Sequence, residues 1–155
     1  MRVSEVMSSN PNCCTPSCTV RMAARILRQF DVGILPVIDD FLTRKLVGVI
    51  TDRDLCLRVL AEVKDPGECT VKEFMTANPV CCSPETDVRK ALAQMATRRV
   101  RRIPVVDRDR RIQGIVSLYD LVRHDAVSPN DIAKIFKKIT ASRVREEVRA
   151  RAAAA

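Results

Sequence analysis

Two short motifs place the same side-chain chemistry at two points in this chain of 155 residues. Residues 48–54 contain a glycine, two β-branched aliphatic residues, a hydroxyl residue and an aspartate three positions later, and residues 114–120 repeat that order. The aliphatic residues predict the end of a buried strand, and the residues after the hydroxyl predict a short helix. Thr51 and Ser117 are therefore expected at helix N-termini, where backbone N–H groups and the helix dipole favour phosphate.

The same motifs also have a purely structural interpretation. Thr51 with Asp54, and Ser117 with Asp120, have the spacing of a capping box, in which a hydroxyl and a carboxylate satisfy the free N–H groups at a helix start. Caps of this kind are common. The spacing alone therefore does not separate a cap from a ligand site, and the surrounding residues have to carry the functional argument.

The composition indicates a soluble protein with an aliphatic core. Hydrophobic residues make up 46% of the chain and aromatic residues 3%, with no Trp. We find no apolar run approaching the ~18–20 residues of a membrane span and no signal-peptide pattern. Seven cysteines without a secretion signal predict free thiols in a reducing compartment. The expected location is therefore cytoplasmic, with no membrane partner.

An internal repeat organises most of the chain. The segment 71–75 with Asn78-Pro79 repeats the segment 3–7 with Asn10-Pro11, and the cysteine pair at 81–82 repeats the pair at 13–14. A two-residue deletion in one turn then brings Gly114 onto Gly48. A repeat held in one register over this length predicts two copies of one structural unit, at residues 1–64 and 69–125.

Each copy predicts the element order β-α-β-β-α, so the expected fold class is mixed α+β. Thr19 and Asp87 are good N-caps for the first helix of each copy. Two strands joined by a short turn predict an antiparallel hairpin with helices on one face. A unit this small has little core of its own, so the copies should pack face to face. The predicted elements are extended pieces at 12–15 and 80–83, helices at 20–30 and 88–98, strands at 34–38, 46–50, 103–106 and 112–116, and helices at 52–61 and 118–123.

A helical extension is predicted at residues 128–155. The sequence Ser-Pro-Asn-Asp from Ser128 is a favourable helix start, and the charged run at 142–151 also favours helix, whereas the terminal alanines are expected to be disordered. An apolar stripe should dock this helix on the body of the protein or on another chain. The stripe consists of Ile132, Ile135, Phe136 and Ile139.

At these positions the chain resembles a tandem pair of cystathionine beta-synthase (CBS) domains. The resemblance spans residue 1 to about residue 125 and is carried by Ile-Leu-Pro-Val-Ile-Asp and Arg-Ile-Pro-Val-Val-Asp, each preceding one of the two motifs. It implies a Bateman module, in which two units pack about a pseudo-twofold axis with two clefts that can bind adenine nucleotides. It also implies that Thr51 or Ser117 contacts phosphate and that Asp54 or Asp120 contacts the ribose hydroxyls.

The chemistry of the neighbouring residues agrees with that resemblance. A carboxylate can accept two hydrogen bonds from a cis-diol, aliphatic walls can sandwich a purine, and arginines can neutralise phosphate. The second motif has Leu118-Tyr119 where the first has Asp52-Arg53, so equal occupancy of the two clefts is not expected. Candidate ligands are AMP, ADP, ATP, S-adenosylmethionine or a dinucleotide. The candidate site residues are Gly48, Thr51, Arg53, Asp54, Ile34, Pro36, Arg101, Arg102, Ile103, Pro104, Gly114, Ser117 and Asp120.

The net charge of +8 keeps a second interpretation open. The positive charge lies in the second half of the chain, as in the run Arg98-Arg99-Val100-Arg101-Arg102, and an anionic partner is expected. The alternative is therefore a basic nucleic-acid-binding protein that uses the repeats as a scaffold or regulator. No recognised DNA-binding motif is visible and stacking aromatic residues are scarce, which disfavours that alternative.

Metal binding and catalysis are not expected. Neighbouring residues of a strand point to opposite faces, so the adjacent cysteines at 13–14 and 81–82 are poorly placed to hold one ion. The chain has one histidine, His124, and its four glycines are scattered, so neither a nucleophile–base pair nor a phosphate loop is present. The sequence thus favours a non-catalytic sensor that acts through an unidentified effector protein. Apolar positions on the two motif helices, together with the stripe at 132–139, predict a homodimer that buries both.

Overall fold

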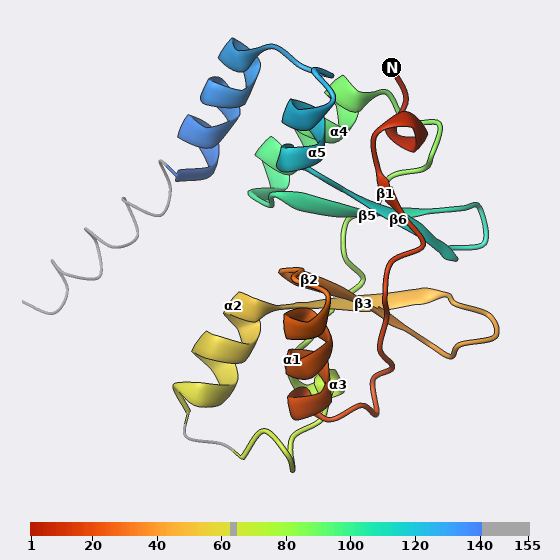
Figure 1. Ribbon diagram of the computed structural model, residues 1–155, viewed down its shortest axis with the longest axis vertical. Coiled ribbons are helices and arrows are strands. Elements are labelled where there is room, and N and C mark those ends of the chain that lie inside the picture. The colour runs from red at the N-terminus through yellow and green to blue at the C-terminus, as the bar shows by residue number, and fades with distance from the viewer. Residues whose placement is uncertain (63–64, 141–155) are drawn as a thin grey trace, which may run out of the picture.

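The computed structural model describes residues 1–62 and 65–140. The predicted charged helix at 142–151 and the terminal alanines lie outside these residues. The two repeats stack on each other, with most of the first repeat in the lower half of Figure 1 and most of the second in the upper half; the opening segment of each repeat lies in the opposite half. Each half contains a sheet of three strands with helices packed against it, so the predicted mixed α+β fold of two units is confirmed.

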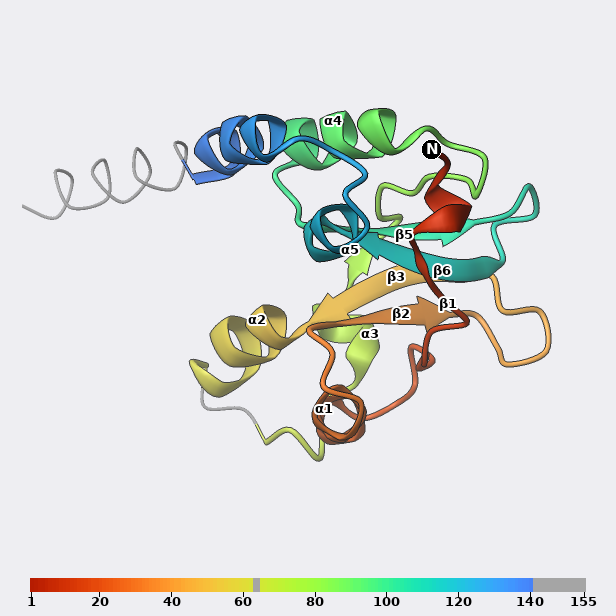
Figure 2. The same ribbon diagram turned by 45° about the horizontal axis from the view of Figure 1, so that its top comes forward.

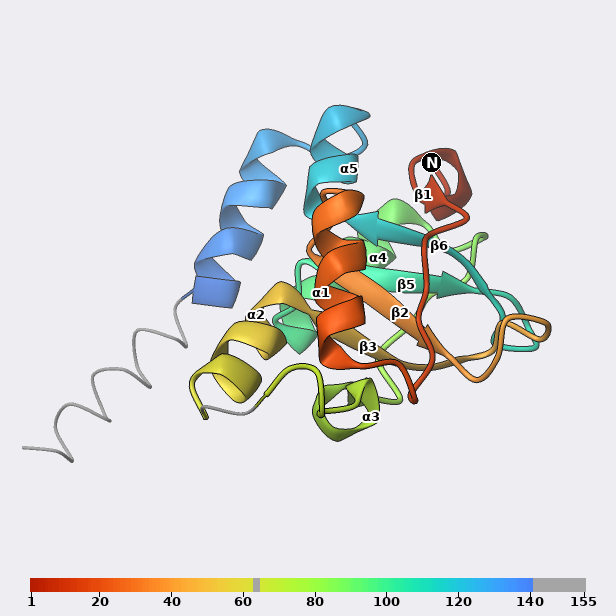
Figure 3. The ribbon, with the colours of Figure 1, turned by 60° about the horizontal axis from the view of Figure 1, so that its bottom comes forward.

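The central part of each sheet is an antiparallel hairpin, as predicted. In the first repeat, β2 (Ile34–Ile38) pairs with β3 (Leu46–Thr51). In the second, β5 (Arg102–Val106) pairs with β6 (Ile112–Ser117). The two hairpin turns project from the same end of the molecule (Figure 3), where Leu46 N donates to Arg110 O at 2.9 Å and Ile112 N donates to Arg44 O at 3.0 Å. The backbone thus joins the two sheets directly.

The third strand of each sheet comes from the other repeat. β1 (Ser8–Ser9) pairs with β6, and β4 (Thr76–Ala77) pairs with β3. The predicted extended pieces at 12–15 and 80–83 make only one isolated parallel bridge each, Cys14 to Val37 and Cys82 to Val105. Their prediction as the third sheet strands is wrong. Each piece ends beside prolines that have no N–H to donate, which limits its pairing.

The exchange of strands is accompanied by an exchange of core residues. The turn η1 (Val3–Glu5) leads into β1, and the helix α3 (Val71–Phe74) leads into β4. Val3 is fully buried in the core of the second repeat, whereas Val71 and Phe74 lie in the core of the first. These apolar anchors carry the following residues onto the edge of the opposite sheet, and the two repeats are interlocked as a result.

The long helix of each repeat forms where the capping residues predict it. α1 (Val20–Gln29) begins after Thr19, whose Oγ1 accepts a hydrogen bond from Met22 N at 3.2 Å. α4 (Val88–Arg98) begins after Asp87, which accepts from Arg89 N at 2.9 Å. Each helix turns its apolar face to its own sheet. The buried positions are Val20, Ala23 and Leu27 in α1, and Val88, Ala91, Leu92 and Met95 in α4.

A C-terminal helix at residues 129–140 docks on the second repeat. It lies beside α4 and α5 (Leu118–Arg123) in Figures 1 and 2. Ile139 is 4% exposed in the core of the second repeat, and Ile132 and Ile135 pack against the same core. Of the two docking surfaces that the sequence left open, the structure shows the body of the protein, so the expectation that a homodimer buries this stripe is wrong. Phe136, the fourth member of the stripe, remains 41% exposed.

Candidate functional site

The first motif forms the junction between β3 and a helical segment made of α2 (Asp52–Asp54) and the π-helical stretch η2 (Leu55–Leu60). Thr51 N donates to Asp54 Oδ2 at 2.9 Å, and Asp54 N donates to Thr51 Oγ1 at 3.2 Å. Thr51 Oγ1 also donates to Asp54 Oδ2 at 2.6 Å. A complete capping box is therefore present at the start of α2.

The second motif repeats this geometry between β6 and α5. Ser117 N donates to Asp120 Oδ2 at 2.8 Å, and Asp120 N donates to Ser117 Oγ at 3.2 Å. The two junctions differ in access, because Asp120 is only 8% exposed whereas Asp54 is half-buried. The carboxylate of the first junction is therefore the one that a ligand reaches more readily.

Capping occupies only one oxygen of each aspartate. Within residues 1–62 and 65–140, every hydrogen bond that the Asp54 or Asp120 carboxylate accepts goes to its Oδ2. Oδ1 of Asp54 keeps its lone pairs for another donor, and a carboxylate oxygen is a good acceptor for a hydroxyl. Capping and ligand binding are thus compatible at this residue, and the two interpretations of the motif do not exclude each other.

A cleft of about 280 Å³ opens between the repeats at the first junction. We call it the first cleft. Its volume lies near the lower end of the range for small-molecule pockets. Seven candidate residues from the sequence line it, namely Ile34, Thr51, Arg53, Asp54, Arg101, Arg102 and Pro104; the other lining residues are Gly33, Val49, Asp52, Thr76, Pro79, Val80, Arg99 and Val100.

The charge of the first cleft is predominantly positive. Four arginines line it, at positions 53, 99, 101 and 102, against two aspartates at 52 and 54. Gly33 provides space between opposite charges, because a Cβ there would lie 3.1 Å from both Arg102 Nη2 and Asp52 Oδ2. An arginine cluster of this kind favours an anionic group such as phosphate. The sequence had not indicated Gly33 or Arg99 as lining residues.

The other six candidate residues do not line the first cleft. Two of them, Ser117 and Asp120, form the capping box of the second junction, and the other four lie as follows. Ile103 is fully buried in the core of the second repeat, because side chains alternate along β5 and its neighbour Pro104 takes the cleft side. Pro36 is buried in β2 opposite Val49 and does not line the first cleft. The remaining two are glycines, Gly48 in β3 and Gly114 in β6, and both face the strand exchanged from the other repeat.

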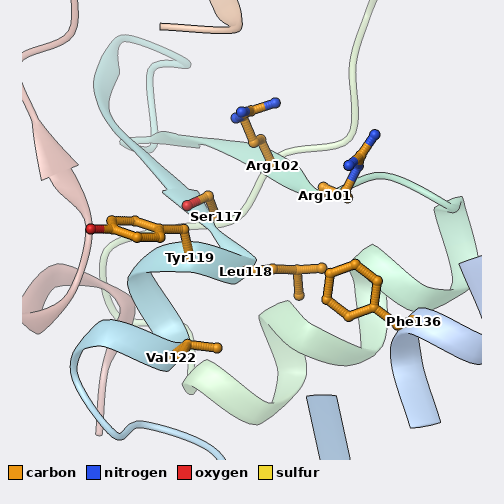
Figure 4. A pocket seen from close by; sticks show the side chains of 7 residues that line it. All are labelled: Arg101, Arg102, Ser117, Leu118, Tyr119, Val122 and Phe136. Carbon is orange, nitrogen blue, oxygen red and sulfur yellow. The ribbon is translucent and has the colours of Figure 1, made fainter. Parts of the chain in front are cut away.

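A second pocket, of about 330 Å³, adjoins the second junction. It combines two exposed arginines with hydroxyl groups and an apolar floor (Figure 4). Phe136 of the C-terminal helix forms part of that floor, a position that the sequence does not predict because its spacing places Phe136 in the docking stripe. The pocket is lined by Arg101, Arg102, Ser117, Leu118, Tyr119, Val122 and Phe136. Ser117 and the two arginines are the candidate residues present there.

The cysteine pairs have the alternating orientation that the sequence predicts. Cys14 and Cys82 lie in the two repeat cores, whereas Cys13 and Cys81 contact the apolar cluster between the sheets. Burial raises the pKa of Cys14 to about 12 and that of Cys82 to about 11, so both thiols are protonated at neutral pH. Within the described residues no group of three or more His, Cys, Asp or Glu side chains is arranged to hold a metal ion.

None of the described helices has the length and apolar character needed to cross a bilayer.

Sequence comparison matches the CBS domain at residues 3–61 and 71–127. Over 120 residues the chain is 36% identical to the uncharacterized protein YlbB of Bacillus subtilis. The aligned region covers 77% of this chain and 79% of YlbB. It is 31% identical over 120 residues to hypoxic response protein 1 of Mycobacterium tuberculosis, covering 77% of this chain and 82% of that protein.

Comparison with solved structures gives the same fold. The CBS domain protein TA0289 of Thermoplasma acidophilum superposes with a TM-score of 0.78 at 29% identity, covering 89% of this chain and 75% of that one. The CBS domain pair of MJ0100 in complex with 5'-methylthioadenosine and S-adenosyl-L-methionine has a TM-score of 0.70 at 31% identity, with coverages of 81% and 95%. CBSX2 in complex with AMP has a TM-score of 0.68 at 32% identity, with coverages of 80% and 95%.

Proposed function

This chain belongs to the CBS domain family, and from that premise we propose that it is a non-catalytic sensor that binds an adenosine phosphate between its repeats. Similar CBS pairs have been solved with AMP and with S-adenosyl-L-methionine. The observation that carries the proposal is the first cleft, where the motif of one repeat lies opposite the arginines of the other. The protein acts in the cytoplasm and passes the signal to an effector protein.

The first cleft offers one group for each part of a nucleotide. Oδ1 of Asp54 accepts from the ribose hydroxyls while Oδ2 maintains the cap. Ile34 and Pro104 provide aliphatic surfaces for the purine from the two repeats. The arginines provide charge-assisted hydrogen bonds to phosphate oxygens. This division of roles requires no aromatic residue, in agreement with an aromatic content of 3%.

The excess of arginine favours a phosphorylated ligand over S-adenosylmethionine. The sulfonium and ammonium groups of that molecule, offset by only one carboxylate, would bring net positive charge to a cleft lined by four arginines and two aspartates. Like charges brought together at short range destabilise a complex, whereas phosphate gains from each arginine. AMP, ADP and ATP are therefore the ligands that we propose.

Removing an arginine should weaken binding in proportion to the phosphate charge. We expect Arg53→Ala and Arg102→Ala to lower the affinity for ATP more than the affinity for adenosine, and the difference should shrink at high salt. Isothermal titration calorimetry at two ionic strengths measures both effects. Arg25→Ala, at an exposed position on α1, is the matched control and should change neither affinity. Equal losses for ATP and adenosine would contradict a phosphate-binding role.

The nucleic-acid alternative has less support. Arg53, Arg99, Arg101 and Arg102 converge on a cleft of small-molecule size rather than on an open surface. A steep salt dependence of binding to a DNA duplex, without any binding of AMP or ATP, would favour that alternative.

A homodimer formed through the first repeat is the expected assembly. The apolar stripe at 132–139 is already covered by its own second repeat, so it does not require a partner. In the second repeat, Tyr119 and Val122 on α5 are also exposed, but they line the second pocket. The first repeat exposes a larger group of apolar side chains on α1 and η2 and beside them, and an isologous contact would cover them. They are Met22 at 46%, Phe30 at 46%, Val32 at 41%, Leu57 at 51% and Leu60 at 62% exposure.

Light scattering tests this assembly. We expect a mass of about 35 kDa, twice the chain mass of 17.4 kDa. Leu57→Glu combined with Leu60→Glu should return the mass to that of one chain, because it introduces charge into the apolar contact. Leu42→Glu is the matched control, since Leu42 is 96% exposed in the hairpin turn of the first repeat. A monomeric wild-type protein at micromolar concentration would contradict the dimer.

A further inference from the structure

The exposure of Phe136 is not explained by the docking of the C-terminal helix. Ile132, Ile135 and Ile139 supply the contacts that fix the helix on the second repeat. Phe136 lies between them in the sequence but borders the second pocket instead and is 41% exposed. In Figure 4 its ring stands beside Leu118 at the edge of that pocket. A large aromatic side chain in this position offers a free face on which a planar group can stack.

The second pocket combines this apolar surface with positive charge. Leu118 and Val122 extend the floor from α5, and Arg101 and Arg102 stand above it (Figure 4). Within the described residues neither arginine forms an ion pair. The backbone holds this side of the pocket in place, because Leu118 N donates to Arg101 O at 3.0 Å. A ligand with a flat ring and a phosphate matches this arrangement.

The two pockets differ in chemistry although the motifs are repeated. The sequence alignment of the repeats places Asp52, Arg53 and Cys56 of the first repeat at the positions of Leu118, Tyr119 and Val122. The first cleft is accordingly polar at its motif, whereas the second pocket is apolar with an aromatic wall. That wall comes from the C-terminal helix, which lies beyond the residues matched by the CBS domain.

We propose that the C-terminal helix is one wall of a second ligand site, in which Phe136 stacks on the base of a nucleoside phosphate and Arg101 holds its phosphate, whereas Arg102, whose Nη2 borders Gly33, serves the first cleft. This proposal rests on the proposed function and extends it to a residue outside the repeats. A bound nucleotide also contacts both the helix and the second repeat. Occupancy of the site therefore stabilises the docked position of the helix.

A single tryptophan tests the proposal directly. The chain contains no Trp, so Phe136→Trp places the only tryptophan at the edge of the second pocket. We expect titration with AMP to quench or shift its fluorescence in a saturable manner, because a stacked base changes the environment of the indole ring. Phe41→Trp, at a residue 61% exposed in the hairpin turn of the first repeat, is the matched control and should not respond.

The affinity of the second site provides an independent measurement. Calorimetry of the wild-type protein should resolve two AMP per chain, and Phe136→Ala should weaken one of them by roughly tenfold, within the range for loss of one stacked base. Phe136→Leu should lose a similar factor while it preserves apolar packing against Leu118, which separates stacking from a folding defect. Arg53→Ala, combined with Phe136→Trp, should leave the tryptophan signal unchanged, because Arg53 lines only the first cleft.

The outcomes distinguish this inference from the proposed function. The second site would be overturned if calorimetry detects AMP binding but the tryptophan does not respond and Phe136→Ala has unchanged affinity. In that case the proposal for the first cleft would stand. If the wild-type protein shows no heat of AMP binding, both the first-cleft site and the second site would be overturned. A saturable tryptophan response that persists when Arg53→Ala is added, together with the loss in Phe136→Ala, would establish the second site.

Discussion

Replacement of Asp54 by alanine is expected to weaken AMP binding by about 1.5–3 kcal/mol, the range for hydrogen bonds to a charged group. That range corresponds to roughly 10- to 150-fold in the dissociation constant. The loss arises because Oδ1 is the acceptor available to the ribose hydroxyls, while Oδ2 is held by Thr51. Calorimetric titration of the folded variant with AMP measures the change.

Two further variants separate ligand binding from capping. Asp54→Asn keeps a carbonyl oxygen for the cap but presents an NH₂ group, a donor, where Oδ1 had been an acceptor. It should therefore lose affinity with little loss of stability. Asp87→Ala removes the N-cap of α4 outside both pockets and should cost about 1 kcal/mol of stability with unchanged affinity. If Asp54→Ala behaved like Asp87→Ala, Asp54 would be a capping residue only.

Gly114→Ala should destabilise the protein by about 1–3 kcal/mol, the usual cost of overpacking. A Cβ at this position would lie 2.6 Å from Met7 Sδ and 2.9 Å from Ser8 O, and the second contact is with backbone. Relief of that contact requires β1 to move away from β6, which weakens the exchange between the repeats. Thermal or urea denaturation measures the loss.

Gly67→Ala is the matched control for this prediction. A Cβ there would come within 2.7 Å of Arg21 Nη2, which is the end of a flexible side chain that can move aside. The denaturation midpoint should change little. A Gly114→Ala variant as stable as Gly67→Ala would contradict the packing role of the glycine. In that case ligand binding would remain as the reason for a glycine at position 114.

The repeated elements could be predicted from local signals. Thr19 and Asp87 set the helix starts, and apolar periodicity predicted both ends of each hairpin strand to within one residue. The resemblance to CBS domains then supplied the arrangement of the two units. Local propensity and patterning agreed with the tertiary structure in these segments, which is the condition for reliable inference from sequence.

The exchanged strands could not be predicted, because β1 and β4 have two residues each and no alternating pattern. Their place depends on Val3 and Val71, whose destination in the opposite core is a long-range property. The assignment of Ile103 to the cleft overlooked the alternation of a strand, which puts either Ile103 or Pro104 on that side. Phe136 fits a docking stripe by periodicity, and only the packed helix reveals that its ring borders a pocket.

Titration of the wild-type protein with AMP and with adenosine tests the central claim most directly. We predict saturable heat with AMP and weaker binding of adenosine, together with a thermal stabilisation that grows with ligand concentration. A ligand at 100 times its dissociation constant adds about 2.7 kcal/mol to the free energy of unfolding. Absence of both heat and stabilisation with AMP, ADP and ATP would contradict the assignment of an adenosine-phosphate site between the repeats.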